Sequence, residues 1–323
     1  MMNSKENKER YRHFCLENTS LPIFSKDWWL DAVCDESWNV CLIENAGVVL
    51  ASMPYHLYRN RLGMTIIAQP PETQTLGPWL RPSDAKIANR LGQEKDLLTE
   101  LIDQLPAFSH FEQSWIHTNT NWLPFYWRGF KQTTRYSYRL PDLSNLDTIW
   151  SGFRENIRKE IRKAKDRFSL KVRTDLSIDD FLVLNEKTYE RQGQPLPYSK
   201  SFIRRLDEAC KTKCSRAIFI AVDAVGRHHA GVYIVWDQQS AYYLMGGGDP
   251  ELRASGAASY CMWEAIQFAA TKTKSFDFEG SMIESVERFF RAFGAIQTPY
   301  FLISKTPSRL LRARQALRTV FAQ

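Results

Sequence analysis

The stretch from Leu244 to Ala258 has the residue types of an anion site. Three glycines, 246 to 248, end a strand-like run, and glycine is favoured where something approaches a backbone closely. A helix pattern begins at Ala258 after small residues, and the free N–H groups of a helix start attract anions. Arg253 adds a positive charge one turn earlier. We predict a phosphate or pyrophosphate site formed by Gly247, Gly248, Arg253, Ser255, Gly256, Ala257 and Ala258. The alternative is a glycine cap with a tight contact between helix and strand.

Four further side chains near this stretch have chemistry of their own. Asp277 and Glu279 stand two apart in a strand pattern over 275–278 and are expected to share one face of it. A carboxylate at the end of a strand can take a proton from a substrate amine. Tyr242 and Tyr243 precede the glycines on opposite faces. The alternatives are loop capping or ion pairing for the acids and core packing for the tyrosines.

Length and composition predict an ordinary globular chain of two domains. The 323 residues exceed the usual size of one core, and 44% of them are hydrophobic. The sequence contains no run of about 18 apolar residues, the length needed to span a membrane. Met1 to Arg12 is polar and charged, so we expect no secretory signal and a cytoplasmic protein. The six cysteines form no CxxC pair, and we expect neither disulfides nor a metal site.

Positive charge is concentrated in two segments of a chain whose net charge is +7. Residues 154–167 carry seven basic and three acidic side chains, and residues 304–323 carry five basic and none. Anionic partners are therefore expected at these two elements. In the tail, apolar residues alternate with four arginines as in helices that lie on anionic membranes. These apolar residues are Leu310, Leu311, Leu317, Val320 and Phe321. The alternative is that they dock on the protein's own surface.

The hydrophobic periodicity predicts an α/β protein with twisted mixed sheets flanked by helices. In the first half we expect strands at 40–44, 48–58, 64–68, 111–117 and 133–140, and helices within 24–33 and at 94–105 and 123–127. In the second half we expect helices at 149–167, 178–190, 199–209, 258–271 and 285–293, and strands at 170–173, 217–222, 230–236, 241–245, 275–278 and 297–303. The predicted parts are a polar lead-in (1–19), two domains (20–141 and 142–304) and a basic amphipathic C-terminal helix (305–323).

An internal repeat with an offset of 165 residues supports duplication of one fold. The strand at 111–117 corresponds to 276–282, and an aromatic helix follows each. Gly129 then corresponds to Gly294, and a final strand follows in both copies.

Several motifs together resemble tandem GNAT acyltransferases of the Fem type (FemABX). Arg253-x-x-Gly256-x-Ala258 is similar to the (Gln/Arg)-x-x-Gly-x-(Gly/Ala) signature with which GNAT proteins hold the pyrophosphate of acyl-coenzyme A. The other motifs are Phe24-Ser25-x-x-Trp28, Leu76-Gly77-Pro78-Trp79, Asn156-Ile157-Arg158-Lys159-Glu160-Ile161-Arg162-Lys163-Ala164, Tyr189-Glu190-Arg191-Gln192-Gly193, Phe276-Asp277-Phe278-Glu279-Gly280-Ser281 and Phe289-Phe290-Arg291-Ala292-Phe293-Gly294. In this order they cover roughly residues 20 to 303.

The resemblance implies two GNAT-like domains, of which only the second has an intact donor site. It implies Glu279 or Asp277 as the base for the acceptor amine and Tyr243 as an acid for the leaving thiolate. The basic helix and the polar loop after it are expected to bind an anionic acceptor beside the cleft between the domains, through Arg158, Lys159, Arg162, Tyr189, Arg191 and Gln192. One departure matters. Phe290 occupies a position where relatives often have lysine, so a cation for the phosphate of a tRNA end is missing there.

The function expected first is N-acyl transfer from acyl-coenzyme A, with acetyl-coenzyme A the expected donor. The acceptor would be an amine on a cell-envelope or polysaccharide precursor, such as a nucleotide- or lipid-linked amino sugar or a muropeptide. The second expectation is Fem-type transfer of an amino acid from aminoacyl-tRNA to a muropeptide amine. The third is a catalytically degenerate protein that binds a glycan or nucleotide. The basic tail adds the expectation of a peripheral contact with the inner face of the membrane.

Overall fold

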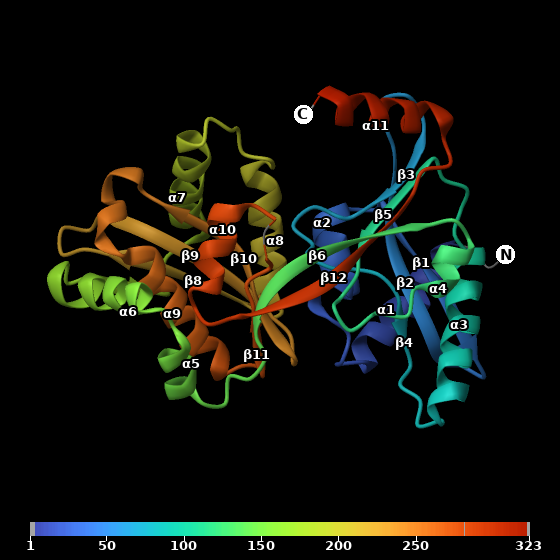
Figure 1. The fold of residues 1–323 in the computed structure, drawn as a ribbon, viewed down its shortest axis with the longest axis horizontal. Helices are drawn as coiled ribbons and strands as arrows, with labels where there is room; N and C mark the ends of the chain where they lie inside the picture. The colour runs from blue at the N-terminus through green and yellow to red at the C-terminus, as the bar shows by residue number, and fades with distance from the viewer. Residues whose placement is uncertain (1–3, 281, 322–323) are drawn as a thin grey trace. The chain divides into compact units, whose positions relative to one another are not determined.

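The computed structural model describes residues 4–280 and 282–321, with side chains described up to residue 315 (Figure 1). Ser281 in the quoted motif and the side chains of Leu317, Val320 and Phe321 thus lie outside the described residues. The chain divides into two compact units, Met1–Arg135 with Pro299–Gln323, and Tyr136–Thr298. In each of them helices cover a mixed sheet.

The first unit is built on strands in the order β1-β2-β3-β5-β12, with β4 beside β2. Its elements are α1 (Ser4–Glu17), η1 (Ile23–Ser25), α2 (Asp27–Cys34), β1 (Trp38–Asn45), β2 (Val48–Arg59), β3 (Thr65–Ala68), β4 (Trp79–Leu80), α3 (Ile87–Asp103), β5 (His110–Ser114), α4 (Leu123–Trp127), the start of β6 (Lys131–Leu140), the end of β12 (Ile296–Lys305) and α11 (Arg309–Phe321).

Strand β1 is buried on both faces because helices pack on each side. Its alternating residues point to opposite faces. Trp38 meets Tyr11 of α1, with ring centroids 6.1 Å apart, while Cys41 and Ile43 share a core cluster with Leu98 of α3. Residues 4–17, expected as a polar lead-in, therefore form a helix that belongs to the core of this unit.

The second unit is built on strands in the order β6-β11-β10-β9-β8-β7. Its elements after β6 are α5 (Leu146–Gly152), α6 (Glu155–Arg162), the π-helical turn η2 (Lys163–Arg167), β7 (Lys171–Arg173), α7 (Ile178–Arg191), α8 (Lys200–Thr212), β8 (Arg216–Val222), β9 (His228–Trp236), β10 (Ser240–Gly248), η3 (Pro250–Ser255), α9 (Ala257–Ala270), β11 (Ser275–Asp277) and α10 (Glu284–Arg291). The pair β10/β11 is parallel, and the other pairs described in this sheet are antiparallel.

Helices α9 and α7 cover opposite faces of this second sheet. Ala230 and Val232 of β9 lie in the core cluster that contains Cys261 of α9, whose Sγ donates to the Ala230 carbonyl at 3.5 Å. On the other face a Cβ at Gly231 would lie 3.0 Å from the Phe181 ring of α7. Small residues at these crossings let each helix approach the sheet closely.

The long helix expected over 149–167 is broken in the structure. α5 ends at Gly152, Phe153 is extended (φ −64°, ψ 141°), and α6 starts at Glu155. The Arg154 N–H donates outside the helix to the Ala292 carbonyl at 2.8 Å, and Phe153 packs its ring on Trp263 and Phe293. The apolar spacing still holds, because the four residues that define it are buried: Ile149, Phe153, Ile157 and Ile161.

The strand expected to close the second domain pairs instead with the first unit. Residues Leu302 to Lys305 of β12 form an antiparallel pair with Phe111 to Ser114 of β5. The second unit in turn contains the end of β6, where Arg139 and Leu140 pair with β11. The structural boundaries thus fall inside these two strands, after Arg135 and after Thr298, and α11 belongs to the first unit.

The element bounds repeat at the offset that the sequence predicts. Adding 165 to β6 (131–140) gives β12 (296–305), and adding it to the first residue of β5 gives the first residue of β11. The matching glycines, Gly129 and Gly294, both have left-handed backbones, with φ of 77° and 70°. Within the described residues, none of the helices has the length and apolar character needed to cross a membrane.

The joint before α9 offers a first test of this packing. Gly256 has φ 80°, and a Cβ there would lie 2.3 Å from the Glu160 carbonyl of α6. Gly226 has a similar φ of 86° but open space around it. We expect Gly226→Ala to cost about 1 kcal/mol of unfolding free energy for the backbone alone, and Gly256→Ala about 1–3 kcal/mol more because α6 must move.

Urea unfolding of both variants against the unmodified protein measures these costs. Equal losses in the two variants would show that α6 does not hold this joint.

Candidate functional site

The parallel strands β10 and β11 separate at the centre of the second unit. They pair from Ser240 to Tyr242 against Ser275 to Asp277, and β10 then continues to Gly248. A register shift against β9 between Tyr243 and Met245 marks a β-bulge. A bulge re-aims the backbone and side chains next to it. Past Tyr242 the described residues of β10 thus have no partner in β11, and the chain here can differ from a regular ladder.

The space beside the three glycines at the end of β10 is occupied mainly by other residues of the protein. A Cβ on Gly246 would lie 1.8 Å from the Tyr243 hydroxyl, and one on Gly247 would lie 2.5 Å from the backbone nitrogen of Asn185 in α7. The Gly248 N–H donates to Thr188 Oγ1 at 2.9 Å. Packing against Tyr243 and α7 therefore accounts for Gly246 and Gly247, which differs from the expected close approach of a donor at Gly247.

The joint between η3 and α9 presents a positive helix end. Gly256, with φ 80°, leads into α9, which begins without a side-chain cap. Arg253 and Ala258 are exposed beside it. The first-turn N–H groups of a helix lack intrahelical partners and attract anions. Ser255 does not contribute its side chain, because it is buried and its hydroxyl donates to the Leu252 carbonyl at 2.8 Å.

Asp249 holds this joint in place from the other end. Its Oδ1 accepts from the Glu251 N–H at 2.9 Å and caps η3, while its Oδ2 pairs with Lys187 of α7 at 2.5 Å. These charge-assisted contacts lower the pKa of Asp249, with the Lys187 hydrogen bond as the first cause. No sequence pattern pointed to Lys187 beyond its place on α7.

Helix α6 lies against the joint and brings an acid to it. A Cβ on Gly256 would lie 2.9 Å from Glu160 Oε2, so this carboxylate stands next to the start of α9. Glu160 pairs with Lys163 at 2.6 Å. A negative group here opposes the binding of an anion, and Lys163 offsets it. The C-terminal end of α6, the basic helix that was expected to bind the acceptor, thus lies beside the loop that was predicted to bind the donor.

Arg158, expected to bind the acceptor, is instead engaged in local structure. Its Nη1 donates to the Ser151 carbonyl at 2.9 Å and so caps α5, and its Nη2 pairs with Glu155 at 2.8 Å. Lys159 and Arg162 are exposed, and Arg162 lies 3.6 Å from Glu155. The two exposed residues remain candidates for an anionic ligand.

Tyr243, Glu279 and Tyr189 come together from three elements. The half-buried Tyr243 ring packs on Phe290 of α10, with centroids 5.6 Å apart. Burial raises the pKa of the Tyr243 hydroxyl, and the Glu279 carboxylate and Tyr189 raise it further. The hydroxyl therefore keeps its proton near neutral pH and can offer it as a hydrogen bond to a developing anion. Tyr242 lies elsewhere in the core and donates to Asp237 at 3.2 Å.

Glu279 does not share a strand face with Asp277 as the spacing suggested. β11 ends at Asp277, and Glu279 follows in a left-handed turn with φ 60°. Gly280 continues the turn with φ 51°, where a Cβ would lie 2.2 Å from the Tyr136 carbonyl. Non-glycine residues in this region are strained and tend to occur at functional sites.

Asp277 is a structural residue rather than an accessible base. It is 5% exposed, lies 3.4 Å from the Arg139 guanidinium, and accepts from the Ser137 hydroxyl. Its Oδ1 also accepts from the Glu279 N–H at 2.8 Å. The carboxylate thus joins β11 to β6 and sets the turn that presents Glu279.

Sequence reasoning missed a polar pair beneath β10. Asn185, 2% exposed, donates to the Gly246 carbonyl at 2.8 Å and accepts from the Tyr198 hydroxyl at 2.8 Å. The Tyr198 ring lies 6.3 Å from that of Tyr189. The available signal was an asparagine on the apolar stripe of α7, since buried polar groups are usually bonded. Arg191 and Gln192 are exposed at the end of this helix.

Phe290 fills the place where relatives often carry a lysine. It is 4% exposed and packs on Tyr243 and Phe278. The neighbouring Arg291 is exposed and pairs with Glu287 at 2.6 Å. The adjacent arginine therefore does not replace the missing cation at this position.

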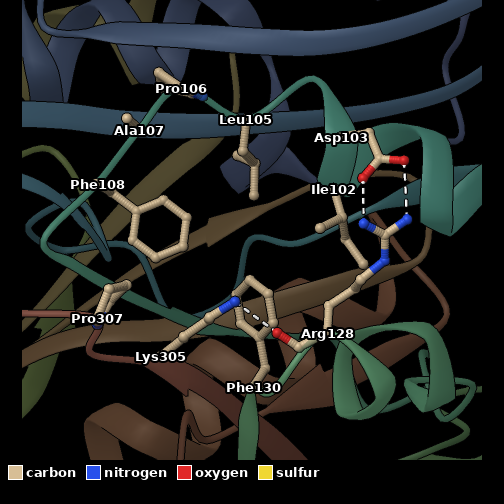
Figure 2. A pocket seen from close by; sticks show the side chains of 10 residues that line it. All are labelled: Ile102, Asp103, Leu105, Pro106, Ala107, Phe108, Arg128, Phe130, Lys305 and Pro307. Atoms are coloured by element: carbon tan, nitrogen blue, oxygen red, sulfur yellow. Dashed lines mark hydrogen bonds and ion pairs between the residues drawn. The ribbon is translucent and has the colours of Figure 1, made fainter.

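A hollow of about 410 Å³ in the first unit does not have the features of a transfer site (Figure 2). Arg128 forms two contacts with Asp103, and Lys305 donates to the Arg128 carbonyl at 2.6 Å and lies over the Phe130 ring. Its polar groups thus satisfy one another. In the part of the chain that the structure describes, no three potential metal ligands come together.

Comparisons with known proteins agree with this geometry. Residues 151–291 match the family described as Acetyltransferase (GNAT) domain, which covers most of the second unit. No curated protein matches the chain. The matched domain includes the parting strands, the joint and the Tyr243–Glu279 pair.

Three solved structures share the fold at low sequence identity. FemX matches with a TM-score of 0.66 and 13% identity over 93% of this chain and 96% of that one. The C-terminal domain of a putative lysylphosphatidylglycerol synthetase from Agrobacterium fabrum matches with 0.59 and 13% over 98% and 96%. L-PGS from Bacillus licheniformis matches with 0.55 and 10% over 94% and 94%. The predicted α/β fold of GNAT-like units and its FemABX-like type are confirmed, and the findings support an acyltransferase.

Asp277 and Glu279 should differ in how much each contributes to the stability of the folded protein. Removing a buried ion-pair partner costs about 3 kcal/mol or more, so Asp277→Ala should lose that much unfolding free energy. Glu279→Ala should lose less than about 1 kcal/mol because its carboxylate is not part of the ion pair and its strained backbone gains little from the side chain.

Asp277→Asn, Arg139→Met and the double variant complete a double-mutant cycle in urea. A coupling energy near zero between 277 and 139 would contradict the structural role of Asp277.

Proposed function

We propose that this protein, which carries a GNAT acetyltransferase domain over residues 151–291 on a FemABX-like fold, transfers an acyl group from acyl-coenzyme A to an amine. Acetyl-coenzyme A is the proposed donor. The proposed acceptor is an amine of a cell-envelope or polysaccharide precursor, such as an amino sugar or muropeptide linked to a nucleotide or lipid. The observation that carries the proposal is the match to the GNAT domain over residues 151–291, which contains the point where β10 and β11 part and, just after their paired residues, Tyr243 and Glu279.

The donor's pyrophosphate is proposed to bind at the start of α9. The N–H groups of Ala257 and Ala258 and the exposed Arg253 supply positive charge on one side. Gly256 is needed there for its left-handed backbone and for the contact with α6. With the pyrophosphate at this end, the acyl thioester would extend toward the opening between β10 and β11.

The proposed chemistry needs three proton movements. An ammonium must lose a proton before its nitrogen can attack the thioester carbon, and the Glu279 carboxylate is the proposed acceptor of that proton. Backbone N–H groups of β10 stabilise the negative oxygen of the tetrahedral intermediate. When the C–S bond breaks, Tyr243 gives its proton to the thiolate, and the second proton of the attacking nitrogen passes to the Tyr243 oxygen and restores the hydroxyl. The products are the amide and free coenzyme A.

A second candidate is transfer of an amino acid from aminoacyl-tRNA. The observation in its favour is the fold shared with FemX and with the lysylphosphatidylglycerol synthetase domain. The buried Phe290 counts against it, since a cation for a tRNA phosphate is missing at that position. The ester of an aminoacyl-tRNA would use the same base and the same opening.

We further propose that the protein works in the cytoplasm at the inner face of the membrane. The start of α11 carries exposed Arg309, Arg312 and Arg314, and Leu310 is 61% exposed while Leu311 is half-buried. Basic residues beside exposed leucine favour an anionic lipid surface. This contact would bring the enzyme to a lipid-linked acceptor.

Donor binding is the first test, and two substitutions should act in opposite directions. Arg253→Glu should weaken acetyl-coenzyme A binding about tenfold or more, because an ionic hydrogen bond is replaced by repulsion. Glu160→Gln should strengthen it about threefold at low salt, because a negative charge beside the pyrophosphate is removed. Both effects should shrink in 0.5 M salt.

Calorimetry measures the dissociation constant of acetyl-coenzyme A for each variant. Lys213→Glu, at the exposed end of α8, is the charge control. If acetyl-coenzyme A does not bind at millimolar concentration while an aminoacyl-tRNA does, the second candidate replaces the first. If neither binds and a glycan or nucleotide does, the protein is a binding module.

The proposed base is tested separately from binding. Glu279→Gln should lower kcat about 10²–10⁴-fold while the donor Kd stays within about twofold, because loss of general-base catalysis affects the chemical step. Tyr243→Phe should retain the packing on Phe290 and lower kcat by a smaller factor at high pH, where coenzyme A can leave as the free thiolate and needs no proton. Unchanged turnover in Glu279→Gln would exclude this carboxylate from the mechanism.

A further inference from the structure

The hollow of about 410 Å³ lies wholly within the first unit and has the composition of a small-molecule site. Its volume falls in the range of ligand pockets, which are mostly apolar with a few polar groups. It lies between the end of α3 with the loop that follows, the end of α4, and residues 305–307. Figure 2 shows the side chains of Ile102, Leu105 and Phe108 directed toward this space, with the Phe130 ring opposite them. An apolar group in the hollow would therefore meet apolar side chains on several sides.

The charged groups of the hollow all have partners, but their charges do not balance. Arg128 and Asp103 form a two-pronged ion pair, with N–O distances of 2.8 and 3.0 Å, and neutralise one another. The Lys305 ammonium instead donates to the Arg128 carbonyl at 2.6 Å and lies 4.9 Å from the centre of the Phe130 ring. Both of these partners are uncharged, and no carboxylate of the described residues forms an ion pair with this half-buried lysine. The hollow therefore carries one net positive charge, and Lys305 has donors beyond the one that it uses.

The duplicated fold shows that this strand end does not require a lysine. At the offset of 165 residues, Lys305 of β12 corresponds to Leu140 of β6. The two positions have the same register, because their partners in the neighbouring strands, Phe111 and Phe276, are also 165 residues apart. Leu140 is 5% exposed and belongs to the core cluster of the second unit. The lysine is therefore a property of this hollow and not of the shared fold.

We propose that the hollow binds a small ligand that carries one negative charge on an apolar body, such as a carboxylate on a short hydrocarbon chain. The anion would accept hydrogen bonds from the Lys305 ammonium, which is a charge-assisted contact, while the hydrocarbon covers Leu105 and Phe108. A cation would be repelled, and a neutral ligand would leave the net charge unmatched. The site lies outside residues 151–291, so the inference goes beyond the proposed transfer and does not depend on it.

The alternative is a purely structural role for Lys305. Its ammonium bonds the carbonyl of Arg128, the residue that ends α4, and cations near the end of a helix stabilise its last carbonyls. Such a role explains the hydrogen bond but not the apolar hollow beside it. It predicts that the hollow treats charged and neutral ligands alike.

Titration of the Leu105 methyl resonances distinguishes the two roles. The methyl groups are labelled with ¹³C, and those of Leu105 are assigned by their loss in Leu105→Met. Octanoate should shift them with a Kd about tenfold or more below that of octanol, which has the same chain without the charge, because a hydrogen bond from a charged donor is worth this factor. Acetate, which has the charge without the chain, should bind more weakly than octanoate. Equal affinities for octanoate and octanol, or no shift with octanoate at millimolar concentration, would overturn the proposal.

Substitution of the lysine assigns the charge. In Lys305→Met, which keeps the length of the side chain, the affinity for octanoate should fall about tenfold or more, to that of octanol, while octanol binding stays within about twofold. Lys272→Met is the matched control, because Lys272 also lies over a phenylalanine ring, that of Phe268 at 5.4 Å, but is exposed on the second unit. A preference for octanoate that survives in Lys305→Met would show that another group binds the anion, against the proposal.

A filled hollow provides a test that keeps the lysine, and it decides the case if Lys305→Met fails to bind octanol as well. Ala107 lines the hollow and is exposed, so Ala107→Trp can occupy part of the space without loss of a core residue. The affinity for octanoate should fall about fivefold or more in this variant, because the hydrocarbon loses apolar contact area. Unchanged affinity for octanoate would place the ligand elsewhere on the molecule and refute the site.

Discussion

The parting of β10 from β11 is the constraint on which the candidate site depends. The strands pair over three residues, and the Asp277 carboxylate then fixes the end of β11 by its contacts with Arg139 and the Glu279 N–H. Parallel strands that stay paired would bury their backbone groups in the ladder. Because these separate, Tyr243 and Glu279 come just after the last paired residues of β10 and β11, and each influences the other electrostatically. The stability of an ion pair away from the substrate thus decides the geometry of the proposed base.

Local patterns in the sequence were sufficient to locate the joint before α9 but not to say what lies against each glycine. The spacing of Arg253, Gly256 and Ala258 predicts a helix start with positive charge, and the structure has one. A run of glycines shows only that something comes close to the backbone. At Gly247 that neighbour is α7, and at Gly256 it is Glu160 of α6. Both contacts join residues 60 or more positions apart, which periodicity does not reveal.

The division into units shows the same limit at larger scale. The repeat of 165 residues was visible because it depends on the order of elements along the chain, and the element bounds follow it. The pairing of β12 with β5 was not visible, since a strand's hydrophobic pattern does not specify its partner. Asp277 was misjudged for a similar reason: its partner Arg139 is on another strand.

The choice of donor depends on charge rather than on fold. An acyl thioester and an aminoacyl ester both present a carbonyl carbon to the proposed base, so the shared fold and this base suit both.

The two donors differ in where their anionic parts must be bound. The pyrophosphate is proposed to bind at the α9 start and Arg253, beside the Glu160 carboxylate and its partner Lys163. A tRNA phosphate would need a cation near Phe290, and the arginine beside it is paired with Glu287. Placing a lysine at 290 would bury a positive charge against Phe278 and Tyr243. Without a phosphate to neutralise it, this charge would cost on the order of 3–5 kcal/mol of unfolding free energy. The aromatic cluster thus leaves no cation at position 290, and for this reason the coenzyme donor is the one proposed first.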